Sequence, residues 1–454
     1  MTNLTSTFID DGLEFNQAVN RYYSRRHSFL SSLSNLCIIS GVNIGLNHDN
    51  PWLLCDYPLY QNPEMLYFTG LNQQETALIF NPFNSTIILA LPEKDEKKEF
   101  WEGYFLGYDS SMVNKIKQLF KFDDVIEYSN IFDYISNTLL STKLNKLNLI
   151  WFEHLKTKKV LKDSHYQFKL QLERYFSNKK HFIQIENCWD SLSFRLCLDD
   201  IDFNNCKYAN FLAEKVFKTT CSHLLSCETE TNVAGILKGT IYKYCSLGQS
   251  FPAIIAAGKN ASILHYQKNN SPLEKDSLLL LDFGCRYQNV VSDISRTIPV
   301  SGTFNPLQRL LYSIVLAAQK KVESILRAGI TIDELNETCW TFIESELDRY
   351  FSKSKGSFTR SYDFSPHNVS HLIAHSVHDG DPFRLYRSEP LQKGMIISNE
   401  PGLYGNFELE INGNFYRDHC GIRIEDNLYI TELGCINLST SIPKEIDEIE
   451  QLIS

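Results

Sequence analysis

The alternation of apolar and polar positions predicts an α/β domain in the first part of the chain. Short apolar runs typical of β-strands stand at 36–40, 66–69, 77–80, 87–91 and 147–152. Helical spacing lies between such runs, most clearly over 16–33, and this mixture is typical of α/β folds. The pattern loosens at 190–198, before a long helical stretch that begins near 202. We therefore expect two domains, at 1–190 and 191–454.

Long helices and apolar strands alternate in the second part, which predicts an α+β domain. Asn305 is a good N-cap, Pro306 stands at the first helical position, and apolar residues recur at helical spacing until Gly329. Thr331 and Glu334 form a capping-box pattern that begins another helix. Apolar strands are expected at 278–283, 395–399 and 421–430.

The charge and the apolar runs of the chain limit its partners. The 454 residues include 44 Lys and Arg against 54 Asp and Glu, a formal charge of −10, and no basic block stands out to neutralise phosphates. We therefore expect no nucleic-acid partner. The longest apolar runs, such as 278–281, are far shorter than the ~20 residues of a membrane-spanning helix, so we expect no membrane partner either.

The N-terminal residues and the cysteines bear on the cellular compartment. The stretch 1–14 is polar and acidic, unlike a secretion signal or an Arg-rich mitochondrial presequence. A cytoplasmic location is expected, and a mitochondrial one only if a presequence is missing from the numbering. The twelve cysteines contain no C-x-x-C pair, which favours reduced thiols over a zinc ribbon or a disulfide framework.

Histidines cluster in one short window of the second part. Four of the twelve lie there: His367, His371, His375 and His378. Their spacings of 4, 4 and 3 would place them on one face of a helix, where an exposed stripe of histidines can be inert. The clustering otherwise indicates a functional site.

Two aspartates flank a predicted turn. Asp282 ends an apolar strand, and Asp293 lies eleven residues further on. In an antiparallel hairpin centred between Tyr287 and Gln288, the two side chains would face each other on one side. Alone, such a pair is typical of solvated turn residues. A carboxylate at the end of an apolar strand, however, is costly to ionise unless a cation or a hydrogen-bond donor compensates it.

Two glutamates stand in similar positions. Glu400 follows an apolar strand and precedes Pro401 and Gly402, which force the chain to turn. Glu425 lies two residues after Arg423, so strand alternation puts both on one face. Each glutamate alone is typical of a salt-bridge partner.

Together these positions offer four carboxylates and one imidazole: Asp282, Asp293, His371, Glu400 and Glu425. Two divalent ions would bring a charge of +4 against −4, so a dinuclear centre would neutralise the set. Oxygen-rich ligation with a single histidine favours Mn²⁺, with Co²⁺ and Zn²⁺ as alternatives. The sequence therefore predicts two divalent metal ions as the cofactor.

An ordered series of motifs resembles the aminopeptidase P (Xaa-Pro aminopeptidase) family of pita-bread dinuclear metallopeptidases. In the second part these motifs lie at 263–266, 281–285, 292–299, 367–371, 377–379, 399–404 and 421–426. Motifs similar to the N-terminal domain of the same family lie at 56–62, 66–70 and 100–103. The stretches 264–270 and 443–451 are similar to the branch that contains mitochondrial intermediate-cleaving peptidase. The resemblance implies an α/β N-terminal domain of the creatinase and ribonuclease-H-like type, followed by an α+β pita-bread catalytic domain.

The resemblance also implies a role for each residue at a motif position. It makes Asp293 and Glu425 bridging ligands of two metal ions. Asp282 would bind one of these ions, and His371 and Glu400 would bind the other. The implied catalytic residues are His265, His367, His378, Glu400 and Arg423. The implied substrate-binding residues are Trp101, Arg387 and Tyr404.

Three positions depart from the residues usual in this family. Ala374 and Ser376 stand where a glycine and an aspartate are usual, and Tyr60 stands in place of an arginine. These departures leave the shape and the specificity of the substrate pocket open. His375 is interpreted as a structural or pocket-wall residue, because the ligand set is complete without it.

The activity that the resemblance implies is metal-dependent release of the N-terminal residue from peptides with proline second. One alternative is an Xaa-Pro dipeptidase (prolidase) with the same metal centre. Another is the processing of imported precursor proteins, and a third is a catalytically silent pita-bread binding module, against which the complete ligand set argues. The family further implies a homodimer or homotetramer, in which Trp101 helps to close a neighbour's substrate pocket.

Overall fold

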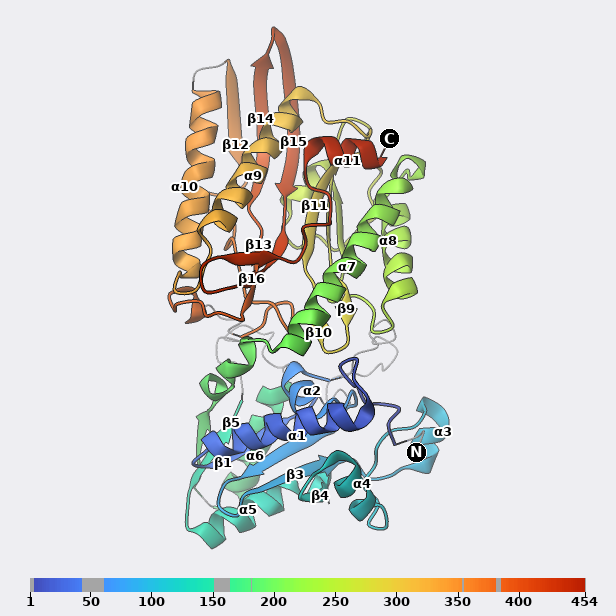
Figure 1. The fold of residues 1–454 in the computed structure, drawn as a ribbon, viewed down its shortest axis with the longest axis vertical. Helices are drawn as coiled ribbons and strands as arrows, with labels where there is room; N and C mark the ends of the chain where they lie inside the picture. The colour runs from blue at the N-terminus through green and yellow to red at the C-terminus, as the bar shows by residue number, and fades with distance from the viewer. Residues whose placement is uncertain are drawn as a thin grey trace. The chain divides into compact units, whose positions relative to one another are not determined.

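The computed structural model describes residues 4–42, 61–150, 164–180, 182–352, 355–380 and 385–453 (Figure 1). The chain divides into two compact units, Met1–Arg195 and Leu196–Ser454. The expectations for 151–152 and for most of the motif at 56–62 lie outside the described residues. Within the described ranges, no helix is long and apolar enough to cross a membrane.

The first unit is built on a six-stranded mixed sheet. Its strands run in the order β4-β3-β2-β1-β5-β6, where the bounds are Leu36–Ser40 (β1), Ala77–Asn81 (β2), Thr86–Leu91 (β3), Asp124–Glu127 (β4), Lys146–Leu149 (β5) and Gln184–Asn187 (β6). β1, β2 and β3 pair antiparallel, and the outer pairings are parallel. The helices are α1 (Phe15–Ser32), α2 (Pro63–Thr69), α3 (Glu96–Glu102), α4 (Val113–Phe120), α5 (Ile131–Thr142) and α6 (Ser164–Asn178).

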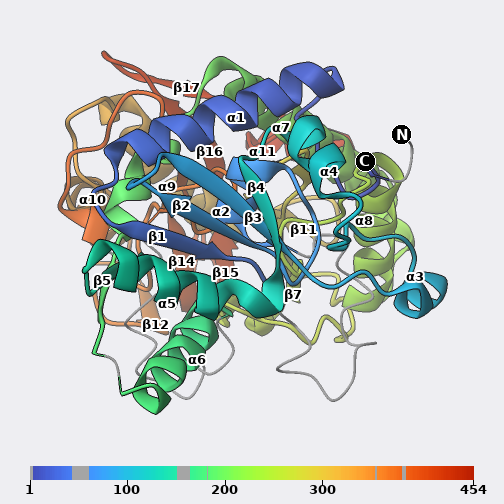
Figure 2. The same cartoon turned by 90° about the horizontal axis from the view of Figure 1, so that it is seen from below.

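Alternate residues of β1 bury opposite faces of this sheet. Cys37 and Ile39 belong to a core that includes residues of α1 and α4. Leu36 and Ile38 belong to a second core, with residues of α5 and α6. Figure 2 shows α1 and α5 on the two sides of the strands. Both faces are covered by helices, and the predicted α/β domain is confirmed.

One predicted strand of this unit is a helix instead. The run 66–69 lies in α2, and the side chain of its N-cap, Asn62, accepts a hydrogen bond from the Met65 backbone N–H. Pro63 begins the helix, and Gly70 ends it in the left-handed conformation, at φ 67°. A four-residue apolar run does not distinguish a strand from a buried helix. The residues that flank the run, Asn62, Pro63 and Gly70, are the signals that indicate a helix here.

The second unit packs helices around antiparallel strands. The helices are α7 (Asp200–Ser222), α8 (Glu230–Tyr244), α9 (Pro306–Ile325), α10 (Ile332–Phe351) and α11 (Ile446–Ile453). The strands are β7 (Ile254–Ala257), β8 (Leu278–Phe283), β9 (Arg286–Tyr287), β10 (Val290–Val291), β11 (Ile294–Pro299), β12 (Gly356–Arg360), β13 (Ile396–Asn399), β14 (Gly402–Ile411), β15 (Asn414–Arg423), β16 (Asp426–Ile430) and β17 (Cys435–Asn437).

The strands of the second unit form three small sheets and a two-stranded ribbon. The sheet orders are β11-β8-β7, β12-β14-β15 and β13-β16-β17, and β9 pairs with β10. Figure 1 shows α10 on the left of these strands and α7 and α8 on the right. One continuous apolar core joins the helices to the strands. This α+β arrangement is the predicted pita-bread fold.

The N-caps of α9 and α10 are the residues predicted from the sequence. Asn305 and Thr331 each cap their helix through a side-chain hydrogen bond, and both form capping boxes. α9 ends at Ile325, a few residues before the predicted end at Gly329. Strong local signals of this kind need no tertiary contact, which explains why both helices could be located from the sequence.

The predicted strand 421–430 is divided in two. β15 ends at Arg423 and β16 begins at Asp426. At the break, the Glu425 backbone N–H donates a hydrogen bond to the C=O of Ser295 in β11 (2.9 Å). The strand pairing changes at this break, from β14 for β15 to β13 for β16. An apolar run in the sequence does not indicate such a change, because it depends on residues far away in the chain.

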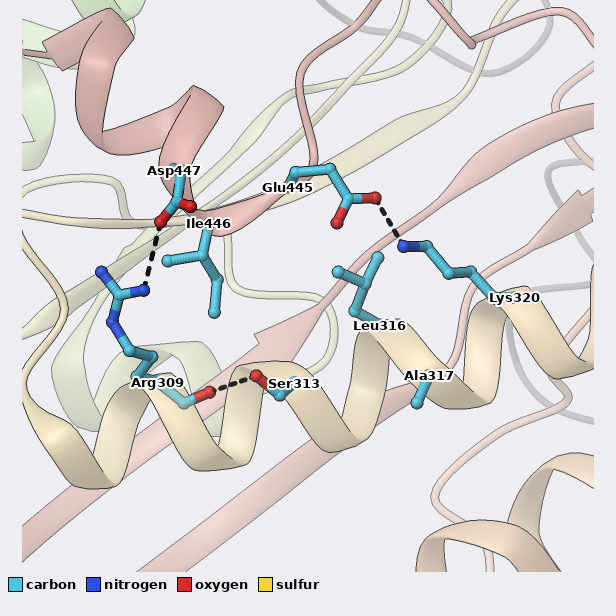
Figure 3. Close-up of a pocket in the computed structure, with 8 residues that line it drawn as sticks. All are labelled: Arg309, Ser313, Leu316, Ala317, Lys320, Glu445, Ile446 and Asp447. Carbon is cyan, nitrogen blue, oxygen red and sulfur yellow. Dashed lines mark hydrogen bonds and ion pairs between the residues drawn. The ribbon is translucent and has the colours of Figure 1, made fainter.

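The C-terminal helix α11 lies beside α9, across a shallow hollow of about 330 Å³ (Figure 3). Arg309 on α9 pairs with Asp447, and Lys320 pairs with Glu445, so ion pairs cross this hollow at two places. These pairs are partly exposed, and exposed ion pairs contribute little to stability. The buried apolar face of α11, which includes Ile449, therefore supplies most of the attachment.

Candidate functional site

A cavity of about 580 Å³ in the second unit collects most of the residues that the sequence singles out. Its wall includes Asp282, Asp293, Glu400, Glu425, Arg387, Arg423, His265, His367, His371 and His378. Tyr404 is almost fully buried and contacts two of these residues, as described below. Trp101 belongs to the first unit, where its side chain on α3 is 76% exposed. The cavity shares no residue with the hollow beside α11.

The two aspartates come from one hairpin, in a register that differs from the prediction. Asp282, near the end of β8, pairs with Ser295 of β11 rather than with Asp293. The turn is centred between Gln288 and Asn289, one residue later than predicted, and Gln288 adopts the left-handed conformation at φ 50°. Direct opposition of the two aspartates is therefore wrong. The register makes them diagonal neighbours on one side of the hairpin.

His371 and Glu400 are brought together by β13. The backbone N–H of His371 donates to the Ser398 Oγ, and its C=O accepts from the Ser398 N–H, both at 2.9 Å. Glu400 follows this strand, and its N–H donates to the C=O of Val369 (2.8 Å). The Nε2 of His371 lies 3.3 Å from a carboxylate oxygen of Glu400. The window 367–378, all of it described, contains no helix, so the alternative of an inert helical stripe is wrong.

Arg423, the last residue of β15, connects both sides of the site. Its guanidinium donates to the Asp282 Oδ2 (2.7 Å), the Tyr404 hydroxyl (3.1 Å) and the Ser295 Oγ (2.8 Å). The Ser295 hydroxyl in turn donates to the Glu425 Oε2 (2.9 Å). The sequence did not single out Ser295, although it lies in the motif 292–299, because only the tertiary structure shows that its hydroxyl joins Arg423 to Glu425.

Asn427 is a second residue that the sequence reasoning missed. Its Oδ1 accepts a hydrogen bond from the backbone N–H of Asp293 (3.0 Å), and its Nδ2 donates to the C=O of the same residue (2.7 Å). This pair of bonds fixes the backbone of Asp293 at the edge of β16. A single asparagine outside the quoted motifs carries no local signal for such a role.

Three carboxyl groups of the site are difficult to ionise together. Burial raises the pKa of Asp282, although Arg423 opposes this rise. Burial and the charge of Asp282 raise the pKa of Asp293 well above its usual range, and burial and the charge of Asp293 do the same for Glu425. Asp282 Oδ1 and Glu425 Oε1 are also buried without a hydrogen-bond partner among the described residues. The cluster therefore carries more negative charge than its surroundings compensate.

This donor set fits a divalent cation. Asp293, His371 and Glu425 offer ligand atoms that all lie within 4.8 Å of one another. Carboxylate oxygens with one imidazole suit hard or borderline divalent metals. A cation here would also offset the repulsion that raises the carboxyl pKa values.

Glu400 and His371 stabilise each other's charged forms. Burial opposes ionisation of Glu400, but the hydrogen bond from His371 and the charges of His371 and Arg423 lower its pKa to about 2. Burial likewise opposes protonation of His371, but Glu400 and Asp293 raise its pKa to about 9. Glu400 is consequently an ionised carboxylate on the cavity wall.

The neighbouring histidines are neutral at pH 7. The charge of His371, whose ring centroid lies 4.4 Å away, and burial lower the pKa of His378 to about 4. Burial also lowers the pKa of His367. The Nδ1 of His367 lies 2.8 Å from the Asn368 C=O, which makes Nδ1 the protonated nitrogen. Its Nε2 then accepts a hydrogen bond from the Tyr404 hydroxyl (3.0 Å).

Arg387 and His375, which the sequence also singled out, contact residues outside the carboxylate cluster. Arg387 lines the cavity and pairs with Asp333 in the first turn of α10, at 2.7 Å. His375 is fully buried and does not line the cavity. Its Nδ1 lies 2.9 Å from the C=O of Asn289, in the turn between β9 and β10.

Comparisons with known proteins agree with this architecture. Residues 204–432 match Metallopeptidase family M24, and residues 22–147 match the aminopeptidase P N-terminal domain. Xaa-Pro aminopeptidase 3 of Mus musculus is 25% identical over 430 residues, which cover 92% of this chain and 80% of that protein. The mitochondrial intermediate cleaving peptidase 55 of Arabidopsis thaliana is 26% identical, over 96% of this chain and 83% of its own. The structure of proline aminopeptidase P II from Yersinia pestis has a TM-score of 0.76 at 25% identity, over 96% of this chain and 99% of that one.

The M24 match includes the carboxylates and histidines that meet in the cavity. The second match covers most of the first unit, which carries the mixed sheet. The resemblance drawn from the motifs is confirmed, and the chain belongs to metallopeptidase family M24, as a member of its aminopeptidase P group.

Proposed function

We propose that this chain is a metal-dependent aminopeptidase that releases the N-terminal residue from peptides with proline second. The observation that carries this proposal is the buried carboxylate cluster beside His371, whose excess negative charge calls for cations. Membership of family M24 supports it, as do relatives named Xaa-Pro aminopeptidase 3 and proline aminopeptidase P II. The intact donor set argues against a catalytically silent binding module.

Five residues would hold two divalent ions: Asp282, Asp293, His371, Glu400 and Glu425. Mn²⁺ suits this oxygen-rich set best, and Co²⁺ and Zn²⁺ are alternatives. When bound, such ions supply Lewis-acid activation of water and of the scissile carbonyl.

Glu400 would be the general base of the reaction. Its carboxylate is ionised at neutral pH and lines the cavity. It would accept a proton from the attacking water and pass this proton towards the nitrogen of the departing proline. Because Glu400 also belongs to the metal-binding set, it would be held in place during this transfer.

Three histidines on the cavity wall would bind the substrate. His378 would donate a hydrogen bond to the carbonyl oxygen as negative charge develops there. His265 and His367 would orient the carbonyl group and the proline ring, and Arg387 would border the pocket. Tyr404 would act from behind the wall, through its hydrogen bonds to His367 and Arg423. The free amine of the substrate would bind near Asp282, which explains why only a terminal residue would be released.

Cleavage of Xaa-Pro-Xaa tripeptides is expected, because Arg423 and the N-terminal motifs resemble aminopeptidase P rather than a dipeptidase. The match of residues 22–147 to the aminopeptidase P N-terminal domain supports this expectation. The test compares the kcat/KM of Xaa-Pro dipeptides and Xaa-Pro-Xaa tripeptides at equal Mn²⁺. Turnover of dipeptides alone would assign the protein to the Xaa-Pro dipeptidases.

A second candidate function is the processing of precursor proteins with residues other than proline at the second position. The similarity to an intermediate cleaving peptidase favours this candidate. A panel of peptides with and without proline second separates the two functions. Faster cleavage of the peptides that lack proline would replace the Xaa-Pro assignment by the processing function.

We also propose a homodimer or homotetramer in which Trp101 reaches a neighbour's substrate pocket. Trp101 and Phe100 are 76% and 84% exposed on α3. Their ring centroids lie 5.9 Å apart, in an edge-to-face arrangement. Large exposed aromatic groups of this kind are typical of interfaces. Trp101→Ala is expected to raise the KM of longer peptides about tenfold, with metal content and folding unchanged.

Mass measurement in solution checks the oligomeric state. Phe182→Ala is the matched control, because Phe182 is 77% exposed elsewhere on the same unit. A monomer with full activity, or equal effects of the two variants, would contradict the interface proposal.

A further inference from the structure

The loop that carries His265 has little regular structure of its own. Residues 258–271, called the His265 loop below, follow β7 and contain only the short 3-10 turn Gly258–Ser262. Three residues of this loop line the cavity: Leu264, His265 and Gln267. A loop without a ladder of backbone hydrogen bonds needs other contacts to hold its side chains in one place.

A buried carboxylate provides such contacts. Glu230 is the first residue of α8 (Figure 1), and its side chain is fully buried. One of its oxygens accepts hydrogen bonds from the Ala257 backbone N–H (2.8 Å) and the Asn260 Nδ2 (2.9 Å). The other accepts from the Tyr266 hydroxyl (2.9 Å) and the Ser271 backbone N–H (2.8 Å). Glu230 therefore binds both ends of the His265 loop and its middle.

The charge of Glu230 makes these bonds strong. All four donors are neutral groups, and hydrogen bonds to a carboxylate are roughly twice as strong as those between neutral groups. The positive end of the α8 dipole also favours a negative charge in the first helical turn. The Glu230 backbone N–H adds a further bond, to the C=O of Ser271 (2.8 Å). Glu230 is thus the main anchor at the α8 side of the loop, while Asn269 binds the Ala253 C=O and the Ile255 N–H and the Ser262 hydroxyl binds the Cys420 C=O.

Tyr266 connects this anchor to the cavity. Its side chain is 5% exposed and packs in a small apolar cluster that includes Leu280 and Tyr404. The preceding residue, His265, is exposed and lines the cavity. Because the two residues are consecutive, a displacement of Tyr266 also displaces His265.

We infer that Glu230 is a positioning residue for the reaction, which acts by holding the His265 loop so that His265 faces the substrate. This inference rests on the proposed function, in which His265 orients the substrate. Glu230 itself does not line the cavity. Its effect on catalysis is therefore expected to pass through His265.

Glu230→Gln is the first test. The amide replaces one acceptor by a donor, so at least one of the four bonds is lost while the volume is kept. We expect kcat/KM for an Xaa-Pro-Xaa tripeptide to fall by about 10-fold to 100-fold, mainly through KM. Metal content is expected to stay unchanged, because the five proposed ligands lie on other elements. Glu228→Gln is the matched control, since Glu228 is an exposed carboxylate two residues earlier.

A double-mutant cycle with His265→Ala tests whether Glu230 acts through His265. The expected result is that Glu230→Gln lowers kcat/KM much less in the His265→Ala protein than in the wild-type protein. Equal effects in both proteins would overturn the inference, since Glu230 would then act on folding alone. If Glu230→Gln does not fold, Tyr266→Phe removes a single hydroxyl from the same anchor and enters the cycle instead.

Amide hydrogen exchange separates this inference from the proposed function. Glu230→Gln should speed exchange at the Ala257 and Ser271 amides, which donate to the carboxylate, whether or not Xaa-Pro peptides are substrates. Unchanged exchange at both amides would overturn the anchoring role. Faster exchange in a protein that cleaves no Xaa-Pro peptide would refute the proposed function and, with it, a role of Glu230 in that reaction.

Discussion

Replacing Glu400 by glutamine is expected to lower kcat for Xaa-Pro-Xaa tripeptides by about 10²-fold or more. The amide cannot accept the proton of the attacking water, and it brings no negative charge to the metal-binding set. It also loses the charge-assisted contact with His371 Nε2, 3.3 Å away in the wild-type protein. Steady-state kinetics at saturating Mn²⁺ measures this loss.

Metal dependence is the companion measurement. Chelation is expected to abolish hydrolysis of the same tripeptide by the wild-type protein, and Mn²⁺ is expected to restore it better than Co²⁺ or Zn²⁺. Glu432→Gln is a suitable control, because Glu432 is an exposed carboxylate in the turn after β16. Full activity in protein shown by metal analysis to be metal-free would refute the proposed mechanism.

The composition of the cavity wall could largely be predicted from the sequence. Asp282 lies near the end of an apolar strand and Glu400 directly follows one, and a carboxylate buried there needs compensation. With Asp293, Glu425 and His371, they form a predicted ligand set whose four negative charges two divalent ions would neutralise. These signals are local, and the structure brings the carboxylates and three histidines of the window 367–378 to one cavity, but not His375.

Strand pairing and element type were harder to predict, because they depend on contacts between distant residues. The register of the β8–β11 hairpin shifts by one residue through the left-handed Gln288. The run 66–69 is helical because Asn62 and Gly70 cap it. His371 lies outside any helix because its backbone pairs with Ser398 of β13.

Supporting hydrogen bonds were not predictable at all. Ser295, Asn427 and Glu230 are buried polar residues whose partners lie far away in the sequence or on another element. Serine, asparagine and glutamate are common on protein surfaces, so residue type alone gives no reason to select them. Their importance follows only from burial combined with complete hydrogen bonding.

Replacing Arg423 by methionine is expected to destabilise the metal-free protein more than the protein loaded with Mn²⁺. The positive charge of Arg423 lowers the pKa of four buried carboxyl groups: Asp282, Asp293, Glu400 and Glu425. Without metal, removal of this cation leaves Asp282 buried and unpaired, at an expected cost of about 3–5 kcal/mol in the free energy of unfolding. Bound Mn²⁺ would compensate the same charges, so the loss should be smaller.

The same substitution is expected to lower activity at saturating Mn²⁺ by about 10-fold to 100-fold, because residues that orient metal ligands typically have effects of this size. Arg423→Lys should recover stability better than activity, since lysine keeps the charge but lacks the planar fork that reaches Asp282, Tyr404 and Ser295 together.

Urea unfolding with and without Mn²⁺ measures the difference in stability. Arg417→Met is the matched control: Arg417 lies on the same strand, β15, but its ion pair with Glu408 is largely exposed. Its effect is expected to stay within about 0.5 kcal/mol in both conditions. An equal loss of unfolding free energy for Arg423→Met with and without Mn²⁺ would contradict this prediction. Arg423 would then stabilise the fold independently of metal, and Mn²⁺ would not compensate the charges of the same carboxylates.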